Sequence, residues 1–90
     1  MALGSIEYKE LLNRFGEDVR EINDDLYQAT KPTTPAKKRE AIIKTARKKL
    51  QEYDALLAQL DGAQRANAEK RFAELMTEMR DSLTPLEKGR

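Results

Sequence analysis

The side chains of this sequence that could do chemistry are its carboxylates and amines: 16 Asp and Glu and 17 Lys and Arg in 90 residues. A carboxylate acts as a general acid or base only where its surroundings shift its pKa. Asp24 and Asp25 are adjacent, so on a helix they project in different directions. The chain has no His and no Cys, which removes the usual general base and the commonest metal ligands. We therefore expect no enzyme activity, no metal ion and no cofactor.

The charged residues could instead bind a partner, because they are unevenly distributed. Residues 6–29 hold seven acidic and three basic residues, whereas residues 35–60 hold seven basic and three acidic ones. Residues 63–84 carry four of each sign. If the first two segments form an antiparallel pair, the acidic end of one lies beside the basic start of the other. This arrangement predicts that opposite charges align the two segments.

In an antiparallel pair of helices, residues at equal distances before and after the turn lie side by side. Reflecting the sequence about the turn in this way predicts individual ion pairs. Arg39 is expected near Asp25, and Arg47 near Glu17 or Asp18. Each exposed pair contributes only about 0–1 kcal/mol. Lys37, Lys38 and Lys48 then remain open to solvent. The candidate partner surface consists of Lys37, Lys38, Lys48, Asp18, Glu21 and Asp25.

The basic run in 35–60 has two other interpretations, a nucleic-acid patch or an anionic-lipid patch. The net charge of the whole chain is only +1, which is low for a dedicated nucleic-acid binder. Aromatic residues that could stack on bases are not interleaved with the basic ones. Nucleic acid is therefore an unexpected partner, whereas a protein or lipid contact stays open.

The elements that position these charges follow from apolar residues spaced alternately four and three apart, which is typical of amphipathic helices. Three helices are predicted, at about 6–29, 35–60 and 63–84, with residues 1–5 and 86–90 frayed. The predicted core positions are Tyr8, Leu12, Phe15, Val19, Ile22, Leu26 and Ala29; Ile43, Ala46, Leu50, Tyr53, Leu57 and Leu60; and Phe72, Met76, Met79 and Leu83. Leu11, Ile42, Leu56 and Leu75 flank these positions.

Turn and cap residues mark the ends of the helices. Ser5 is expected as the N-cap of the first helix, and Thr34 as the N-cap of the second with Pro35 at its first position. Pro85 is expected to end or kink the third helix. Gly16 marks either a close approach of two helices or a tolerated surface glycine, of which we favour the second.

The predicted fold is all-α, a single domain over 1–90 folded as an antiparallel up-down-up three-helix bundle. Short connections make consecutive helices antiparallel neighbours. No apolar run approaches the ~20 residues that span a bilayer, and no secretory signal opens the sequence.

Three stretches of the sequence resemble the N-terminal Habc domain of SNARE proteins, and among these the Vti family of Qb-SNAREs. IEYKELLNRF (6–15) opens a helix that ends in a short Pro/Thr linker. LQEYDALLAQLD (50–61) is similar to the leucine-rich end of that family's second helix. RANAEKRF (65–72) and SLTPL (82–86) are similar to the start and the Pro-Leu ending of its third helix.

This resemblance implies a non-catalytic sorting or regulatory domain in vesicle traffic, on the cytosolic face of endosomes and the trans-Golgi network. Its partner would be an ENTH-type adaptor or SNARE helices. Any membrane contact would come from a segment outside this chain. A domain of that kind is expected to stay monomeric at tens of micromolar.

Two alternatives remain open. The chain could be a helical building block of a bacterial or phage assembly, which predicts self-association through Leu11, Ile42, Leu56 and Leu75. It could also be the basic-patch binder of nucleic acid or anionic lipid, which predicts salt-sensitive binding.

Overall fold

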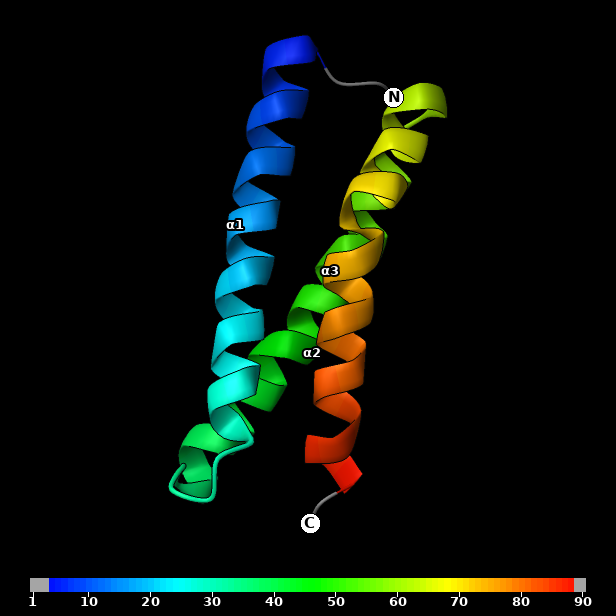
Figure 1. The fold of residues 1–90 in the computed structure, drawn as a ribbon. Coiled ribbons are helices and arrows are strands. Elements are labelled where there is room, and N and C mark those ends of the chain that lie inside the picture. Colours follow the sequence, from blue (N-terminus) through cyan, green and yellow to red (C-terminus); the bar gives the residue numbers. More distant parts are fainter. Residues whose placement is uncertain (1–3, 89–90) are drawn as a thin grey trace.

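A computed structural model describes residues 4–88, which form three α-helices: α1 (Ser5–Ala29), α2 (Ala36–Gln59) and α3 (Gly62–Lys88). α1 and α3 run in the same direction and α2 runs against both (Figure 1). The predicted all-α three-helix bundle is confirmed. The molecule is a rod with Cα extents of 44 × 20 × 17 Å.

The hydrophobic core is shared by all three helices. The predicted core positions of α1 are buried except Tyr8, which is half-buried, and those of α3 are all buried. In α2, Ile43, Ala46 and Tyr53 are buried as predicted, and so is Leu60 just after the helix. The predicted core positions Leu50 and Leu57 are only half-buried, whereas Leu56, expected to flank the core, is buried. Ala68 and Leu86 are further core residues that the spacing did not indicate.

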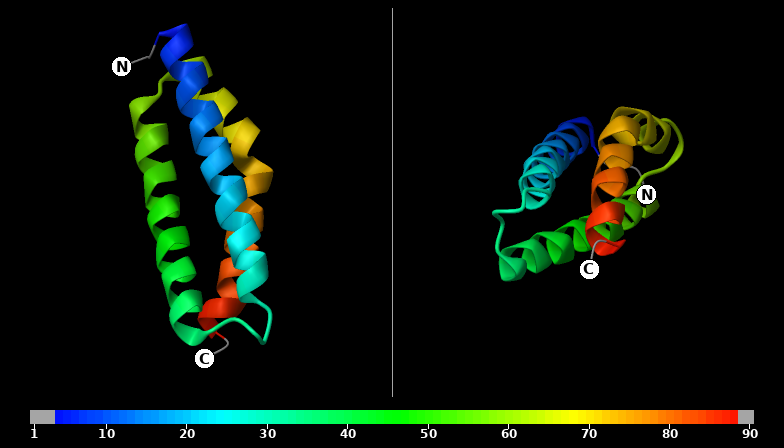
Figure 2. Two further views of the ribbon diagram at one scale, coloured as in Figure 1. Left: turned by 90° about the vertical axis from the view of Figure 1, so that its left-hand side faces the viewer. Right: turned by 60° about the horizontal axis from the view of Figure 1, so that its bottom comes forward.

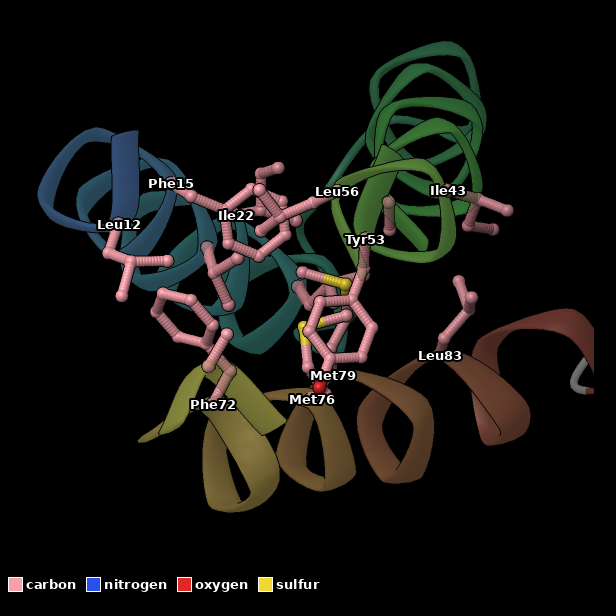
Figure 3. Close-up of a cluster of buried hydrophobic side chains, with 14 of the residues drawn as sticks. Leu12, Phe15, Ile22, Ile43, Tyr53, Leu56, Phe72, Met76, Met79 and Leu83 are labelled. Carbon is pink, nitrogen blue, oxygen red and sulfur yellow. The ribbon is translucent and has the colours of Figure 1, made fainter. Parts of the chain in front are cut away.

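One aromatic ring from each helix meets at the centre of the core (Figure 3). The ring centroids of Phe15 and Tyr53 are 5.8 Å apart, those of Phe15 and Phe72 5.1 Å, and those of Tyr53 and Phe72 6.3 Å. The last two pairs meet edge to face, a favoured arrangement of aromatic rings. The three helices therefore contact one another at the same height along the bundle.

Gly16 is buried where α1 meets α3, so the favoured surface interpretation was wrong. A Cβ at this position would lie 3.3 Å from Cε1 of Phe72. The glycine therefore allows α1 to approach the Phe72 ring more closely than a larger residue could.

The ends of the helices differ from the predicted ones. Gly4 and Pro35, not Ser5 and Thr34, are the N-cap residues of α1 and α2, and neither makes a side-chain cap. The Thr34 hydroxyl instead donates to the carbonyl oxygen of Gln28, 2.7 Å away. It thereby stabilises the carboxyl end of α1 rather than the start of α2.

α3 continues through Pro85 to Lys88, so its predicted end at 84 and the fraying of 86–88 were wrong. Pro85 removes one helical N–H bond. Burial of Leu86 in the core and an ion pair between Glu87 and Arg47 hold the last turn in place. Residues 1–3, 89 and 90, also expected to fray, lie outside the described residues.

Candidate interaction surface

α1 and α2 lie side by side (Figure 2, left), and three depressions between their side chains form a groove. Near the α1–α2 turn it holds a depression of about 140 Å³ lined by Ile22, Asp25, Lys38, Ala41, Ile42 and Thr45. A depression of about 280 Å³ in the middle is lined by Asp18, Glu21, Ile22, Asp25, Thr45 and Lys49. At the far end, about 240 Å³ is lined by Leu11, Phe15, Glu52, Ala55, Leu56 and Gln59. We call the surface formed by these residues the α1–α2 face.

Four of the six predicted surface residues lie on this face. Asp18, Glu21 and Asp25 form an acidic wall on α1, and Lys38 stands on the opposite wall, on α2. The floor between the walls is apolar and includes half-buried Ile42. The face thus combines an apolar strip with charged residues on both sides.

Lys37 and Lys48 are exposed and line none of these depressions. Lys48 follows the groove-lining Thr45 by three residues, so it stands on the outer rim of the same face. Among residues 4–88, neither lysine forms an ion pair.

The residue that joins the two walls is Lys49, which the sequence did not single out. Its ammonium lies 3.4 Å from Asp18, 2.5 Å from Glu52 and 5.4 Å from the centroid of the Phe15 ring. Burial lowers the pKa of Lys49, but the carboxylates of Glu52 and Asp18 outweigh burial and leave that pKa raised. Lys49 is therefore a charged bridge between α1 and α2.

The ion pairs predicted by reflection about the turn were wrong. Arg39 donates its Nε to the carbonyl oxygen of Ala29 (3.3 Å) and its Nη2 to that of Thr34 (3.4 Å), rather than pairing with Asp25. Arg47 pairs with Glu87 of α3 rather than with α1. Asp18 lies against Lys49 rather than Arg47, so the register of α1 against α2 is shifted by two to three residues from the predicted one.

The contact between α1 and α3 carries a different set of polar interactions. Asn13 accepts a hydrogen bond of 2.8 Å from Arg71. Farther along, buried Asn23 donates its Nδ2 to the carbonyl oxygen of Leu75 at 3.3 Å, while its Oδ1 accepts no hydrogen bond from residues 4–88. The only sequence signal for Asn23 is its place beside the apolar stripe of α1.

Within residues 4–88, no group of three His, Cys, Asp or Glu side chains is arranged to hold a metal ion. None of the helices in that part of the chain has the length and apolar content to cross a bilayer. Compared with known proteins, the chain matches no protein-family model, no curated protein and no solved structure.

Proposed function

We propose that this chain is a non-catalytic protein-interaction module that binds its partner along the α1–α2 face. The observation that carries the proposal is the groove itself, with its apolar floor between an acidic and a basic wall. Protein interfaces characteristically place apolar contacts at the centre and charged groups at the rim. The carboxylates of this face stand on its walls rather than deep inside a cavity, which suits recognition better than acid–base chemistry.

The resemblance to Habc domains of the Vti family supports a more specific version of this proposal. In that version the partner is an ENTH-type adaptor or a SNARE helix, and the chain is a sorting handle on endosomal or trans-Golgi membranes. This version rests on the sequence pattern of 6–15, 50–61, 65–72 and 82–86. The acidic wall of α1 is the part of the face that a basic adaptor surface would contact.

The adaptor version is tested by titrating the chain with a purified ENTH domain in a calorimeter. Saturable binding that is lost in the double variant Glu21→Lys/Asp25→Lys is the expected result. The matched control is Glu74→Lys/Glu78→Lys, which reverses two exposed charges on α3 and should bind like the unmodified chain. Equal binding by both variants would place the contact elsewhere, and no binding by the unmodified chain would remove the adaptor as partner.

A specific observation favours a second candidate, the helical building block. Acidic residues of α1 and basic residues of α2 line the same depressions, Asp25 with Lys38 in one and Asp18 with Lys49 in the next. A surface that carries both signs in this way can be complementary to itself. The partner would then be another copy of the chain.

A further inference from the structure

We propose that the α1–α2 face binds a second copy of the same chain in a dimer whose two-fold axis runs parallel to the helices. This inference rests on the proposed role of that face as an interaction surface, and it names the partner. It follows from the heights at which charges lie on α1 and α2 and from the sign of each charge.

The contact between Asp18 and Lys49 fixes the relative height of the two helices. Because α1 and α2 are antiparallel, residues equally far from this pair in opposite directions along the sequence lie level. Asp25 is then level with Ile42, and Leu11 with Leu56. The linings of the depressions agree, because Asp25 shares one with Ile42 and Leu11 shares another with Leu56.

A two-fold axis parallel to the helices and above the groove keeps every residue at its height and exchanges the two walls. α1 of the second copy then lies on α2 of the first, and α2 of the second copy lies on α1 of the first. Such an interface is isologous, so every contact occurs twice. The four helices α1 and α2 of both copies form the centre of the dimer.

The charges that meet in this arrangement are opposite in sign along most of the face. Glu21 of the second copy comes level with Ala46, about 3 Å along the axis from Lys48, which stands on the outer rim of α2. Asp25 of the second copy comes to the depression that Lys38 lines. At the other end, Arg14 of the second copy comes level with Glu52, which lines the far depression.

The size of the face and its floor are suitable for a dimer. The molecule is 44 Å long and 17–20 Å across, which accommodates the ~800 Å² that each partner contributes to a standard interface. Half-buried Leu11 and Ile42 lie along the groove between the charged walls. They supply apolar contacts that the isolated chain leaves partly open to water.

The alternative two-fold axis in this face, perpendicular to the helices, gives the opposite electrostatic result. It lays α1 on α1 and α2 on α2. With this axis at the height of the Asp18–Lys49 contact, Asp18 meets Asp18 and Lys49 meets Lys49. Like charges in juxtaposition are strongly unfavourable in an interface, so at this height charge favours the parallel axis.

The experiment uses two charge-reversed variants of the full chain and sedimentation equilibrium from about 1 µM to about 1 mM. Glu21→Lys/Asp25→Lys makes the acidic wall basic, and Lys38→Glu/Lys48→Glu makes the basic wall acidic. We expect the unmodified chain to dimerise and each variant alone to dimerise at least roughly tenfold more weakly. An equimolar mixture of the two variants should form heterodimers, because every contact between them again joins opposite charges.

The control Glu74→Lys/Glu78→Lys reverses exposed charges on α3 and should dimerise like the unmodified chain. Circular dichroism melts confirm that each variant is folded. An unmodified chain that stays monomeric throughout the concentration range would overturn the proposal. Dimers that both variants still form, or variants that fail to rescue each other when mixed, would also overturn it.

Sedimentation of the chain alone contains no adaptor, so it separates this inference from the proposed function. A monomeric chain that binds an ENTH domain through Glu21 and Asp25 would assign the face to that partner and refute the dimer. A charge-rescued dimer without adaptor binding would keep the face as an interaction surface and refute the adaptor. A monomeric chain that binds no ENTH domain would refute both the dimer and the adaptor.

Discussion

Asn23 is the polar side chain that α1 buries against α3, with 6% of its surface exposed. Its amide donates one hydrogen bond, to the carbonyl oxygen of Leu75, while its Oδ1 is buried without a partner in the part of the chain that the structure describes. A buried polar atom without a hydrogen bond costs about 1–3 kcal/mol. Asn23 therefore lowers the stability of the α1–α3 contact while its one bond favours a single register of these helices.

Replacing this amide by an apolar side chain of similar volume should stabilise the bundle. We expect Asn23→Leu to raise the free energy of unfolding by about 1 kcal/mol in urea denaturation, because it removes the unsatisfied oxygen and adds apolar burial. Asn23→Asp should lower the same quantity, since a carboxylate cannot donate to Leu75 and its charge would be buried. A loss of stability in Asn23→Leu would show that the hydrogen bond outweighs the unsatisfied oxygen.

At the scale of the elements, the connection between α1 and α2 depends on hydrogen bonds to carbonyl oxygens that a helix leaves unpaired at its carboxyl end. The Thr34 hydroxyl donates to Gln28, and the Arg39 guanidinium donates to Ala29 and Thr34. A positive charge at the carboxyl end of a helix also interacts favourably with the helix dipole. Arg39 thus belongs to the turn, although the sequence places it in a run of basic residues.

Arg39→Ala should therefore destabilise the fold, whereas Lys38→Ala should have almost no effect. We expect a loss of about 1–2 kcal/mol for Arg39→Ala, because two charge-assisted hydrogen bonds to the turn disappear. Lys38 is the matched control, since it is the neighbouring basic residue and is exposed. Urea denaturation of both variants, below the concentration at which the chain associates, measures the difference. Equal losses would mean that the bonds of Arg39 contribute nothing beyond its charge.

At the scale of the whole molecule, apolar spacing sufficed to predict the bundle because each helix buries one stripe. It could not choose between Leu56 and Leu57, since that choice depends on how α2 crosses two other helices. The spacing also ended α3 at Pro85, because the sequence does not show that Leu86 reaches the core and that Glu87 reaches Arg47.

The candidate site was predictable to a similar extent. Asp18, Glu21, Asp25 and Lys38 were identified from charge alone, and the structure brings them to one groove. The bridging role of Lys49 could not be predicted, because it requires knowing that the Lys49 side chain turns toward Phe15 and Asp18. A charge pattern locates residues along a helix, and only packing decides which neighbours they contact.

The central aromatic junction also makes the stability of the whole bundle sensitive to alkaline pH. Burial raises the pKa of Tyr53, and the negative charge of Glu69 raises it further. The positive charge of Arg80 lowers it, but by less, so the pKa stays raised. The pKa of Lys49 is also raised, because Glu52 and Asp18 outweigh the effect of its burial. Both groups keep their protons in the folded state at a pH where the unfolded chain has begun to release them, so their contribution to stability is lost as pH rises.

Between about pH 7 and 9, these two groups should therefore not change the free energy of unfolding. Above about pH 10 the free energy of unfolding should fall, because Tyr and Lys lose their protons in the unfolded chain. Tyr53→Phe keeps the ring in contact with Phe15 and Phe72 but removes the titrating hydroxyl, so the fall should become shallower. Tyr27→Phe, at a tyrosine with 65% of its surface exposed, is the matched control and should leave the fall unchanged. Urea denaturation across this pH range measures all three chains. An equally steep fall in Tyr53→Phe would show that ionisation of the central tyrosine does not limit the alkaline stability of the bundle.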